Sequence, residues 1–330
     1  MTPALPLVAI LGPTASGKSA LAVRVARQFA GEVVLCDSTQ LYRYFDIGTA
    51  KVPQSEQQGI PHHLYDLLEP HELFTAGDYR RRAIAVLADL RKRGKLPVFT
   101  AGTGLYLRAL LEGLSDAPSR SEALRQRLRD RSARRGPRHL HRILTRLDPA
   151  SAARIAPQDS TKVIRAIEIC MESGRPMSEV HRQPREKLQG YRIIKIGLAP
   201  PRQFLYHRIA QRTAAMLAAG WLEEVRALVA RSDAGHSEVT ALPEKPFQFI
   251  GYSELRAHLQ GELPLEAAVA AIEQATRRYA KRQITWFRRE ENVEWFAGFG
   301  DDRETANAVL AYLITQFQEG GSLTSVDSSG

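Results

Sequence analysis

Eight residues near the N-terminus have the types and the spacing that hold a phosphate group. They follow the apolar run Leu7–Leu11 and fit the P-loop pattern Gly-x-x-x-x-Gly-Lys-Ser/Thr. Glycines let successive N–H groups point inward, the following helix adds the positive end of its dipole, and lysine adds a full charge. An accidental glycine-rich turn is the alternative. The motif predicts a phosphate site, with Ser19 as a ligand of Mg²⁺, made of Gly12, Pro13, Thr14, Ala15, Ser16, Gly17, Lys18 and Ser19.

A second polar segment, Asp37–Gln40, begins where the apolar run Val33–Cys36 ends. In open α/β sheets, ligands bind beyond the carboxyl ends of the strands, so we expect Asp37 to project into the crevice that the P-loop lines. A carboxylate beside a bound phosphate can act as a base or as a metal partner. Two other interpretations stay open: a side-chain cap of a turn, and an acidic residue that holds a ribose.

The segment Ala101–Tyr106 follows another apolar run, Pro97–Thr100. Its glycines permit close approach of the backbone, and Thr103 offers a hydroxyl group at the edge where ligands bind. A simple turn from strand to helix explains the segment equally well.

The segment Thr276–Arg289 combines helical periodicity with basic and aromatic side chains. Basic groups beside aromatic rings suit RNA. An ordinary amphipathic helix, with Trp286 and Phe287 in the core and its arginines in solvent, is an equal alternative.

Composition bounds the class of protein. The chain has 330 residues, 44% of them hydrophobic, and no apolar run near the roughly 18 residues that cross a bilayer. The N-terminal apolar stretch leads straight into the P-loop rather than to a signal-peptide cleavage site. We therefore expect a cytoplasmic protein with no membrane partner. Cys36 and Cys170 are far apart, so neither a disulfide framework nor a zinc site is expected.

The formal net charge of +10 makes a polyanionic partner plausible. Ten arginines lie between residues 120 and 146. A solvated helical face explains such a run, but arginine also favours bidentate contacts with phosphate. Solvation and nucleic-acid binding are both open for this segment.

Apolar runs at Leu7–Leu11, Val33–Cys36 and Leu96–Thr100 alternate with helical patterns, which predicts a parallel sheet with crossover helices. The sequence then becomes charged and helical until the apolar run Arg192–Leu198 returns to the core. The predicted fold class is α/β, with a P-loop NTPase-like parallel-sheet core and an inserted helical domain. We place the core with its C-terminal helices at residues 1–113 and 191–318, the insertion at 114–190, and a disordered tail at 319–330.

Seven motifs, taken in order, resemble those of the bacterial tRNA dimethylallyltransferases, also called tRNA isopentenyltransferases, of the IPP transferase family. The resemblance covers nearly the whole chain up to about Arg289. The motifs are Gly12–Ser19, Asp37–Arg43, Asp46–Lys51, Pro61–Leu64, Ala101–Tyr106, Ile250–Tyr252 and Arg277–Arg288.

The resemblance implies that a dimethylallyl group passes from dimethylallyl diphosphate to N6 of the adenosine on the 3′ side of the tRNA anticodon. The P-loop and Mg²⁺ would stabilise the departing diphosphate. Asp37 would accept the amino proton of an adenine flipped out of the anticodon loop, with Thr103 as a second catalytic residue. The enzyme is expected to be a monomer that binds the anticodon stem-loop.

The resemblance also assigns binding roles. Thr14–Ser19 and Arg212 would contact the prenyl donor. The family's Asp-x-x-Arg-x-x-Arg-Ala segment reads Asp159–Ala166 here, with Lys162 where arginine is usual, so a point charge replaces a planar fork. Ala101 likewise stands where the family has glycine. The residues expected to bind tRNA are Asp37, Ser38, Thr39, Gln40, Thr103, Arg125, Thr161, Lys162, Val163, Ile164 and Arg165.

Two other classes of protein stay open. In a kinase, the P-loop would hold ATP and Asp37 would take a proton from a hydroxyl group, but the arginine-rich insertion would have no role. An RNA-binding module without catalysis would explain the charge but not the P-loop.

Overall fold

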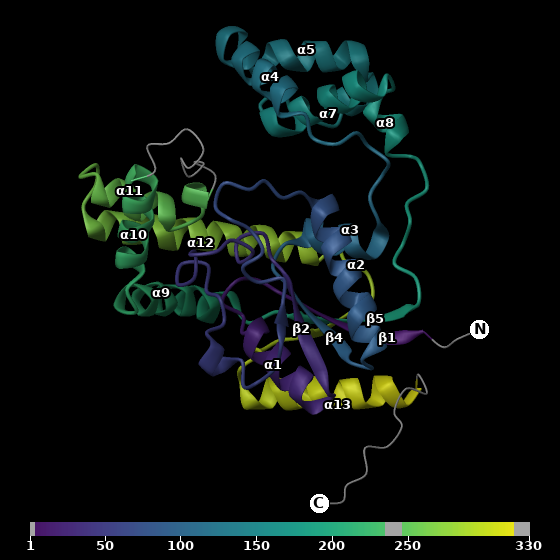
Figure 1. Cartoon of the computed structure of the whole chain (residues 1–330), viewed down its shortest axis with the longest axis vertical. Coiled ribbons are helices and arrows are strands. Elements are labelled where there is room, and N and C mark those ends of the chain that lie inside the picture. Colours follow the sequence, from purple (N-terminus) through teal and green to yellow (C-terminus); the bar gives the residue numbers. More distant parts are fainter. Residues whose placement is uncertain (1–3, 235–245, 320–330) are drawn as a thin grey trace, which may run out of the picture. The chain divides into compact units, whose positions relative to one another are not determined.

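A six-stranded, all-parallel sheet forms the core of one unit of the computed structural model, which describes residues 4–234 and 246–319 (Figure 1). The strand order is β3-β2-β4-β1-β5-β6. The strands are β1 (Leu5–Leu11), β2 (Gly31–Cys36), β3 (His62–His63), β4 (Leu96–Ala101), β5 (Tyr191–Leu198) and β6 (Val293–Phe296).

The three central strands end in register. Ala101, the last residue of β4, is paired with Leu11 on one side and with Cys36 on the other. All six residues of β2 and of β4 are buried, as expected for strands covered on both faces. The segments that follow these strands therefore leave the sheet at the same edge.

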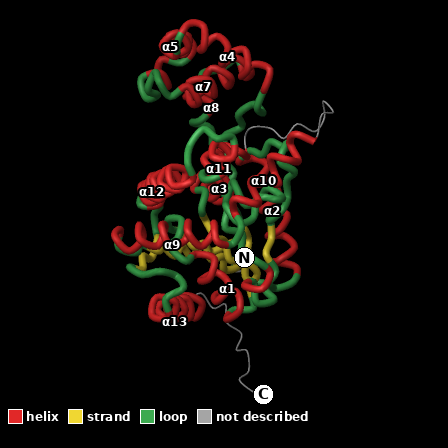
Figure 2. The backbone as a smooth tube through the Cα atoms, turned by 90° about the vertical axis from the view of Figure 1, so that its left-hand side faces the viewer, coloured by secondary structure: helices red, strands yellow, loops and turns green. Residues whose placement is uncertain are grey.

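Helices cover both faces of the sheet. The helices α1 (Lys18–Gln28) and α13 (Arg303–Glu319) lie side by side on one face (Figures 1 and 2), where Leu21, Val309 and Leu313 join the core formed by the strands. Right-handed crossovers place α2 (Ala76–Lys92) and α3 (Gly104–Glu112) on the other face.

The remaining helices of this unit come after β5. They are α9 (Arg202–Ala218), α10 (Trp221–Ala234), α11 (Tyr252–Leu259) and α12 (Leu265–Phe287); short 3₁₀ turns lie at η1 (Gln54–Glu56) and η2 (Pro246–Gln248). Buried Leu205 and Ile209 of α9 pack against Ala280 of α12. This contact holds α9 and α12 together, so that both helices are fixed next to the P-loop.

The chain folds into two compact units, and residues 111–188 form the smaller one, which we call the helical unit. Its helices are α4 (Glu122–Arg135), α5 (Pro137–Leu147), α6 (Pro149–Ala152), α7 (Ser160–Ser173) and α8 (Met177–Val180). Ser121, Asp148 and Asp159 accept hydrogen bonds from backbone N–H groups at the starts of α4, α6 and α7. Leucines of α4 and α5 pack on Val163 and Ile167 of α7 in a small core of its own.

The predicted fold class is confirmed, and the structure contains each apolar run predicted as a strand. Sequence reasoning missed β3, which is only two histidines long, and β6, whose residues are half-buried or exposed at the sheet edge. Of the predicted tail 319–330, only Glu319 lies within the described residues, as the end of α13. None of the described helices has both the length and the apolar composition needed to cross a bilayer.

The core of the helical unit makes a prediction about stability. Leu140 is fully buried on α5, whereas Leu147 on the same helix is 37% exposed. We expect Leu140→Ala to lower the free energy of unfolding of this unit by about 2–5 kcal/mol, because it removes buried methyl groups and leaves a cavity. Leu147→Ala, the control, is expected to change it by about 0.5 kcal/mol. Hydrogen exchange of the α5 and α7 amides measures both, and equal effects would contradict the assignment of Leu140 to the core.

Candidate functional site

The P-loop connects the end of β1 to the start of α1, and its conformation requires its glycines. Gly17 has φ +82°, and a Cβ atom there would collide with the Asp301 carboxylate. Gly12 has φ +150°, and its Cβ atom would lie 2.9 Å from the carbonyl oxygen of Leu198. The chain thus curls tightly, as a phosphate-binding loop must.

The polar groups of the P-loop have few acceptors within the protein. Within the described part of the chain, Lys18 donates hydrogen bonds through Nζ to the loop's own carbonyl oxygens alone, at 2.9 Å to Gly12 and 2.7 Å to Pro13. Burial lowers the pKa of Lys18 from 10.5 to about 7; the Asp37 carboxylate opposes this shift and Arg212 adds to it. The hydroxyl oxygen of Ser16 is buried and has no hydrogen-bond partner among the residues that the structure describes. An anion in the loop would satisfy both groups.

Gln283 of α12 ties the P-loop to the turn that follows β4. Its Oε1 accepts a hydrogen bond from the backbone N–H of Thr14 at 2.7 Å, and its Nε2 donates to the carbonyl oxygen of Gly102 at 2.8 Å. The Tyr279 hydroxyl donates to the same carbonyl at 3.3 Å. Both amide atoms are satisfied and the side chain is 5% exposed, so the two segments are held at a fixed separation.

Two arginines of α9 flank the loop. Arg212 donates through Nη1 to the Thr14 hydroxyl at 3.2 Å, and burial lowers its pKa from 12.5 to about 10. Arg208, one turn earlier, forms a bidentate ion pair with Asp301. The adjacent Gly300 donates its N–H to the carbonyl oxygen of Ser16 at 2.8 Å. The helix α9 and the segment before α13 therefore both pack against the P-loop.

Asp37 lies directly after β2, at the edge predicted from the sequence. Its Oδ1 accepts hydrogen bonds from the backbone N–H of Thr39 at 2.8 Å and from the Thr39 hydroxyl at 2.7 Å. Its Oδ2 packs against Gly102 and has no hydrogen-bond partner within the described residues. The turn-capping interpretation thus accounts for Oδ1 of Asp37, while Oδ2 is available to accept a proton.

The structure brings Thr103 to the same edge. Its hydroxyl accepts a hydrogen bond from the N–H of Ser38 at 3.1 Å and lies 3.3 Å from the Ser38 hydroxyl. Gln40 donates to the carbonyl oxygens of Thr49 and Ala50. The polar residues that follow β2 and β4 therefore form one hydrogen-bonded layer beside the P-loop.

In the helical unit, two of the arginines predicted to bind tRNA already have a partner. Arg125 and Arg165 both pair with Glu168, whose side chain is fully buried. Burial raises the pKa of Glu168, but hydrogen bonds from Arg125, Arg165 and the N–H of Ser121 outweigh it and lower the pKa from 4.5 to about 2. These arginines hold the unit together in addition to any role toward RNA.

The other residues predicted in this segment divide by exposure. Thr161 and Lys162 are exposed, and Lys162 pairs with Asp159 at 2.6 Å. The side chains of Val163 and Ile164 are buried in the core of the unit. Those two residues have almost no side-chain surface to offer an RNA, so contact through this segment is left to Thr161, Lys162 and the half-exposed Arg165.

Sequence reasoning missed Gln283, Tyr279 and the Arg208–Asp301 pair. A signal for Gln283 exists, because it shares a helical face with buried Ala280 and Phe287, where a polar residue needs a partner. Nothing in the sequence connects Arg208 with Asp301.

The donor set fits a magnesium ion that takes most of its ligands from a substrate. Within residues 4–234 and 246–319 no three acidic, histidine or cysteine side chains gather in a way that could hold a metal. The half-buried Ser19 lines a cavity of about 310 Å³. Mg²⁺ commonly binds through one or two protein oxygens together with phosphate oxygens and water, so a single hydroxyl ligand suits it.

Comparison with known proteins gives the context for this site. The model of the IPP transferase family matches residues 40–290. The chain is 50% identical to a tRNA dimethylallyltransferase of Solibacter usitatus, over 94% of this chain and all of that protein. It is 51% identical to a tRNA dimethylallyltransferase of Koribacter versatilis, over 94% of this chain and 98% of that one.

Solved structures agree. A tRNA isopentenylpyrophosphate transferase from Bacillus halodurans, 36% identical, aligns with a TM-score of 0.67 over 96% of this chain and 98% of that one. A eukaryotic dimethylallyltransferase acting on tRNA, 26% identical, aligns with a TM-score of 0.81 over 97% and 80%. A P-loop on an all-parallel sheet places the chain in the class of P-loop α/β proteins.

The chain belongs to the IPP transferase family. The resemblance drawn from the seven motifs is therefore confirmed, as is the predicted enzyme class, a tRNA prenyltransferase. The roles assigned to individual residues stay predictions.

The buried Glu168 predicts a pH dependence. Because its pKa is about 2 in the folded chain and 4.5 when unfolded, its ion pairs stabilise the helical unit fully above pH 4.5 and lose this effect as the pH falls toward 2. Glu168→Gln is expected to be less stable than the wild type at pH 7, and the difference should shrink at most about 1.4 kcal/mol per pH unit below pH 4.5.

Denaturant unfolding followed at several pH values measures this difference. Glu172→Gln, an exposed position on the same helix, is the control and should show no such trend. A difference for Glu168→Gln that stays constant down to pH 2 would contradict a carboxylate held ionised by its arginines.

Proposed function

We propose that this protein transfers a dimethylallyl group from dimethylallyl diphosphate to N6 of the adenosine on the 3′ side of the anticodon in tRNA, with release of diphosphate. The proposal rests on one observation above the others. The Asp37 carboxylate lies close enough to Lys18 and Arg212 to oppose the lowering of both pKa values by burial. A general base and a cationic cradle for a leaving group therefore lie near one another at the same edge of the sheet.

The cradle suits a diphosphate. Lys18 and Arg212 supply positive charge, and the Ser16 hydroxyl and the loop amides supply hydrogen bonds. These groups are fixed before the reaction, so they stabilise the charge that develops on the departing oxygen without reorganising. When Mg²⁺ is bound at Ser19, it supplies further neutralisation of that charge.

The acceptor side needs a base. N6 attacks the first carbon of the dimethylallyl group, the C–O bond to the diphosphate breaks, and its electron pair leaves with the diphosphate oxygen. The nitrogen then carries an extra proton, for which Asp37 Oδ2 is the acceptor. Thr39 holds Oδ1 with two hydrogen bonds and so orients the carboxylate. Thr103, hydrogen-bonded to Ser38, lines the same edge.

We assign tRNA binding to the helical unit, residues 111–188, together with the Asp37–Gln40 segment. Exposed arginines that have no carboxylate partner among the described residues are concentrated near the junction of α4 and α5, and they suit phosphate contacts. They include Arg131, Arg135, Arg138 and Arg142. The cytoplasmic location and the monomeric state stay predictions.

A transfer assay tests the proposed function. The protein is incubated with Mg²⁺, unmodified tRNA and either dimethylallyl diphosphate or ATP, and the RNA is analysed by mass spectrometry. We expect the mass of one dimethylallyl group on the anticodon-loop adenosine, only with the prenyl donor. Phosphate transfer from ATP would instead indicate a kinase, and binding without any transfer would indicate an RNA-binding module.

Substitutions of Asp37 separate the base from the turn cap. Asp37→Ala should leave tRNA affinity within a few-fold and lower kcat by about 10² or more. Asp37→Asn is the matched control, because its oxygen can keep both hydrogen bonds from Thr39 but cannot take up the proton. We expect it to be as impaired as Asp37→Ala in single-turnover transfer. Wild-type kcat in Asp37→Asn would leave Asp37 only the turn-capping role.

A further inference from the structure

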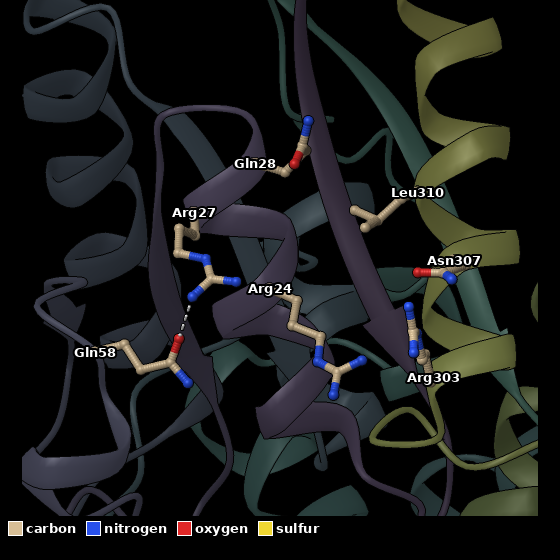
Figure 3. Close-up of a pocket in the computed structure, with 7 residues that line it drawn as sticks. All are labelled: Arg24, Arg27, Gln28, Gln58, Arg303, Asn307 and Leu310. Carbon is tan, nitrogen blue, oxygen red and sulfur yellow. Dashed lines mark hydrogen bonds between the residues drawn. The ribbon is translucent and has the colours of Figure 1, made fainter.

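A second polar cavity lies between α1 and α13, on the sheet face covered by these two helices (Figure 3). Its volume is about 400 Å³, within the range of sites for small molecules. Its polar lining residues come from the second half of α1, the residues after η1 and the first two turns of α13. They are Arg24, Arg27, Gln28, Gln58, Arg303 and Asn307.

Of the described residues that line this cavity, three carry guanidinium groups and none carries a carboxylate. Arg24 donates a hydrogen bond to the carbonyl oxygen of Asp301 at 3.3 Å, and Arg27 donates to Oε1 of Gln58 at 3.0 Å. Both acceptors are neutral. In the part of the chain that the structure describes, neither these two arginines nor Arg303 forms a salt bridge. The three positive charges therefore remain uncompensated, and an anion would relieve their mutual repulsion.

The chemistry of the lining favours phosphate over other anions. Each guanidinium group presents a planar fork that matches two phosphate oxygens, and the side-chain amides of Gln28 and Asn307 add donors. Arg303 is the first residue of α13, so the positive end of the helix dipole also lies at the cavity. Leu310 is the one apolar residue among the described residues that line the cavity.

We propose that this cavity binds a small phosphate-bearing molecule at a site separate from the P-loop. The phosphate group belongs either to a free inorganic ion or to a nucleotide, since both present the same oxygens. This proposal does not rest on the proposed function, because a binding measurement tests it without any assay of prenyl transfer.

The contacts of Arg24 decide which residues to change. Arg24 also lines the cavity that contains Ser19, and its partner Asp301 packs on Gly17 and pairs with Arg208. Substitution of Arg24 would therefore alter the wall of the P-loop. Arg27 and Arg303 are exposed, and neither is among the described residues that line the cavity containing Ser19. Their substitution therefore changes the second cavity with less effect on the P-loop than substitution of Arg24.

The test is equilibrium binding of phosphate, diphosphate and ATP to the full chain at 0.15 M salt, where weak surface attraction is screened. Calorimetry of the wild type should resolve two sites for diphosphate, one in the P-loop and one in the cavity. The double variant Arg27→Gln, Arg303→Gln should keep the first and weaken the second at least tenfold. The probe that loses most affinity identifies the source of the phosphate group.

A matched control removes the same charge elsewhere. Arg82 and Arg91 are exposed on α2, and Arg82→Gln, Arg91→Gln should keep both sites. Identical diphosphate binding in the wild type and in the Arg27, Arg303 variant would overturn the proposal. So would a variant that loses tRNA affinity but binds the three small probes unchanged, because the surface would then be an RNA contact.

A measurement on the wild-type protein tests the same site without relying on the folding of the variants. Phenylglyoxal modifies accessible arginines, and peptide mass spectrometry reports each position. In the wild type, the effective probe should slow modification of Arg27 and Arg303 at least tenfold while Arg82 reacts at its usual rate. Equal rates with and without the probe at all three positions would contradict a site in the cavity.

Discussion

One buried amide holds the candidate active site together. Gln283 accepts from Thr14 with one atom and donates to Gly102 with the other, across 269 positions of sequence in the first case. Only one orientation of the amide satisfies both partners, because the oxygen cannot donate and the nitrogen cannot accept. The phosphate loop and the strand end beside Asp37 are thereby kept at one separation, on which any reaction between their ligands depends.

Charge is the second constraint on this site. Two half-buried cations, Lys18 and Arg212, lie near a single carboxylate, Asp37, and partial loss of solvent disfavours both positive charges. An incoming diphosphate reverses that imbalance, so the protein recovers on binding the desolvation cost that it bears when the loop is empty. The Ser16 hydroxyl, which has no hydrogen-bond partner among the described residues, would likewise gain one when a ligand binds.

Local sequence patterns predicted most strands and the edge of the sheet at which the candidate site lies, but not the contacts between residues far apart in the sequence. Four strands followed from apolar runs, and the rule for strand ends placed Asp37 near the P-loop. β3 and β6 escaped because two histidines and a half-exposed edge segment carry no apolar period. Arg125 looked like any solvated arginine of its run, since its partner Glu168 lies 43 residues away and only folding joins them. The same holds for Arg208 and Asp301, 93 residues apart.

The hydrogen bond from Gly300 to Ser16 has a consequence for biosynthesis. A ribosome makes the chain from its N-terminus, so β1 and α1, which flank the P-loop, emerge before Gln283, which follows Thr14 by 269 residues, and before Gly300. A nascent chain thus contains the P-loop before the segments that pack against it, which contain Gln283 and Gly300, have been made. The binding site proposed for the P-loop is therefore complete only after Gly300 has been added to the chain.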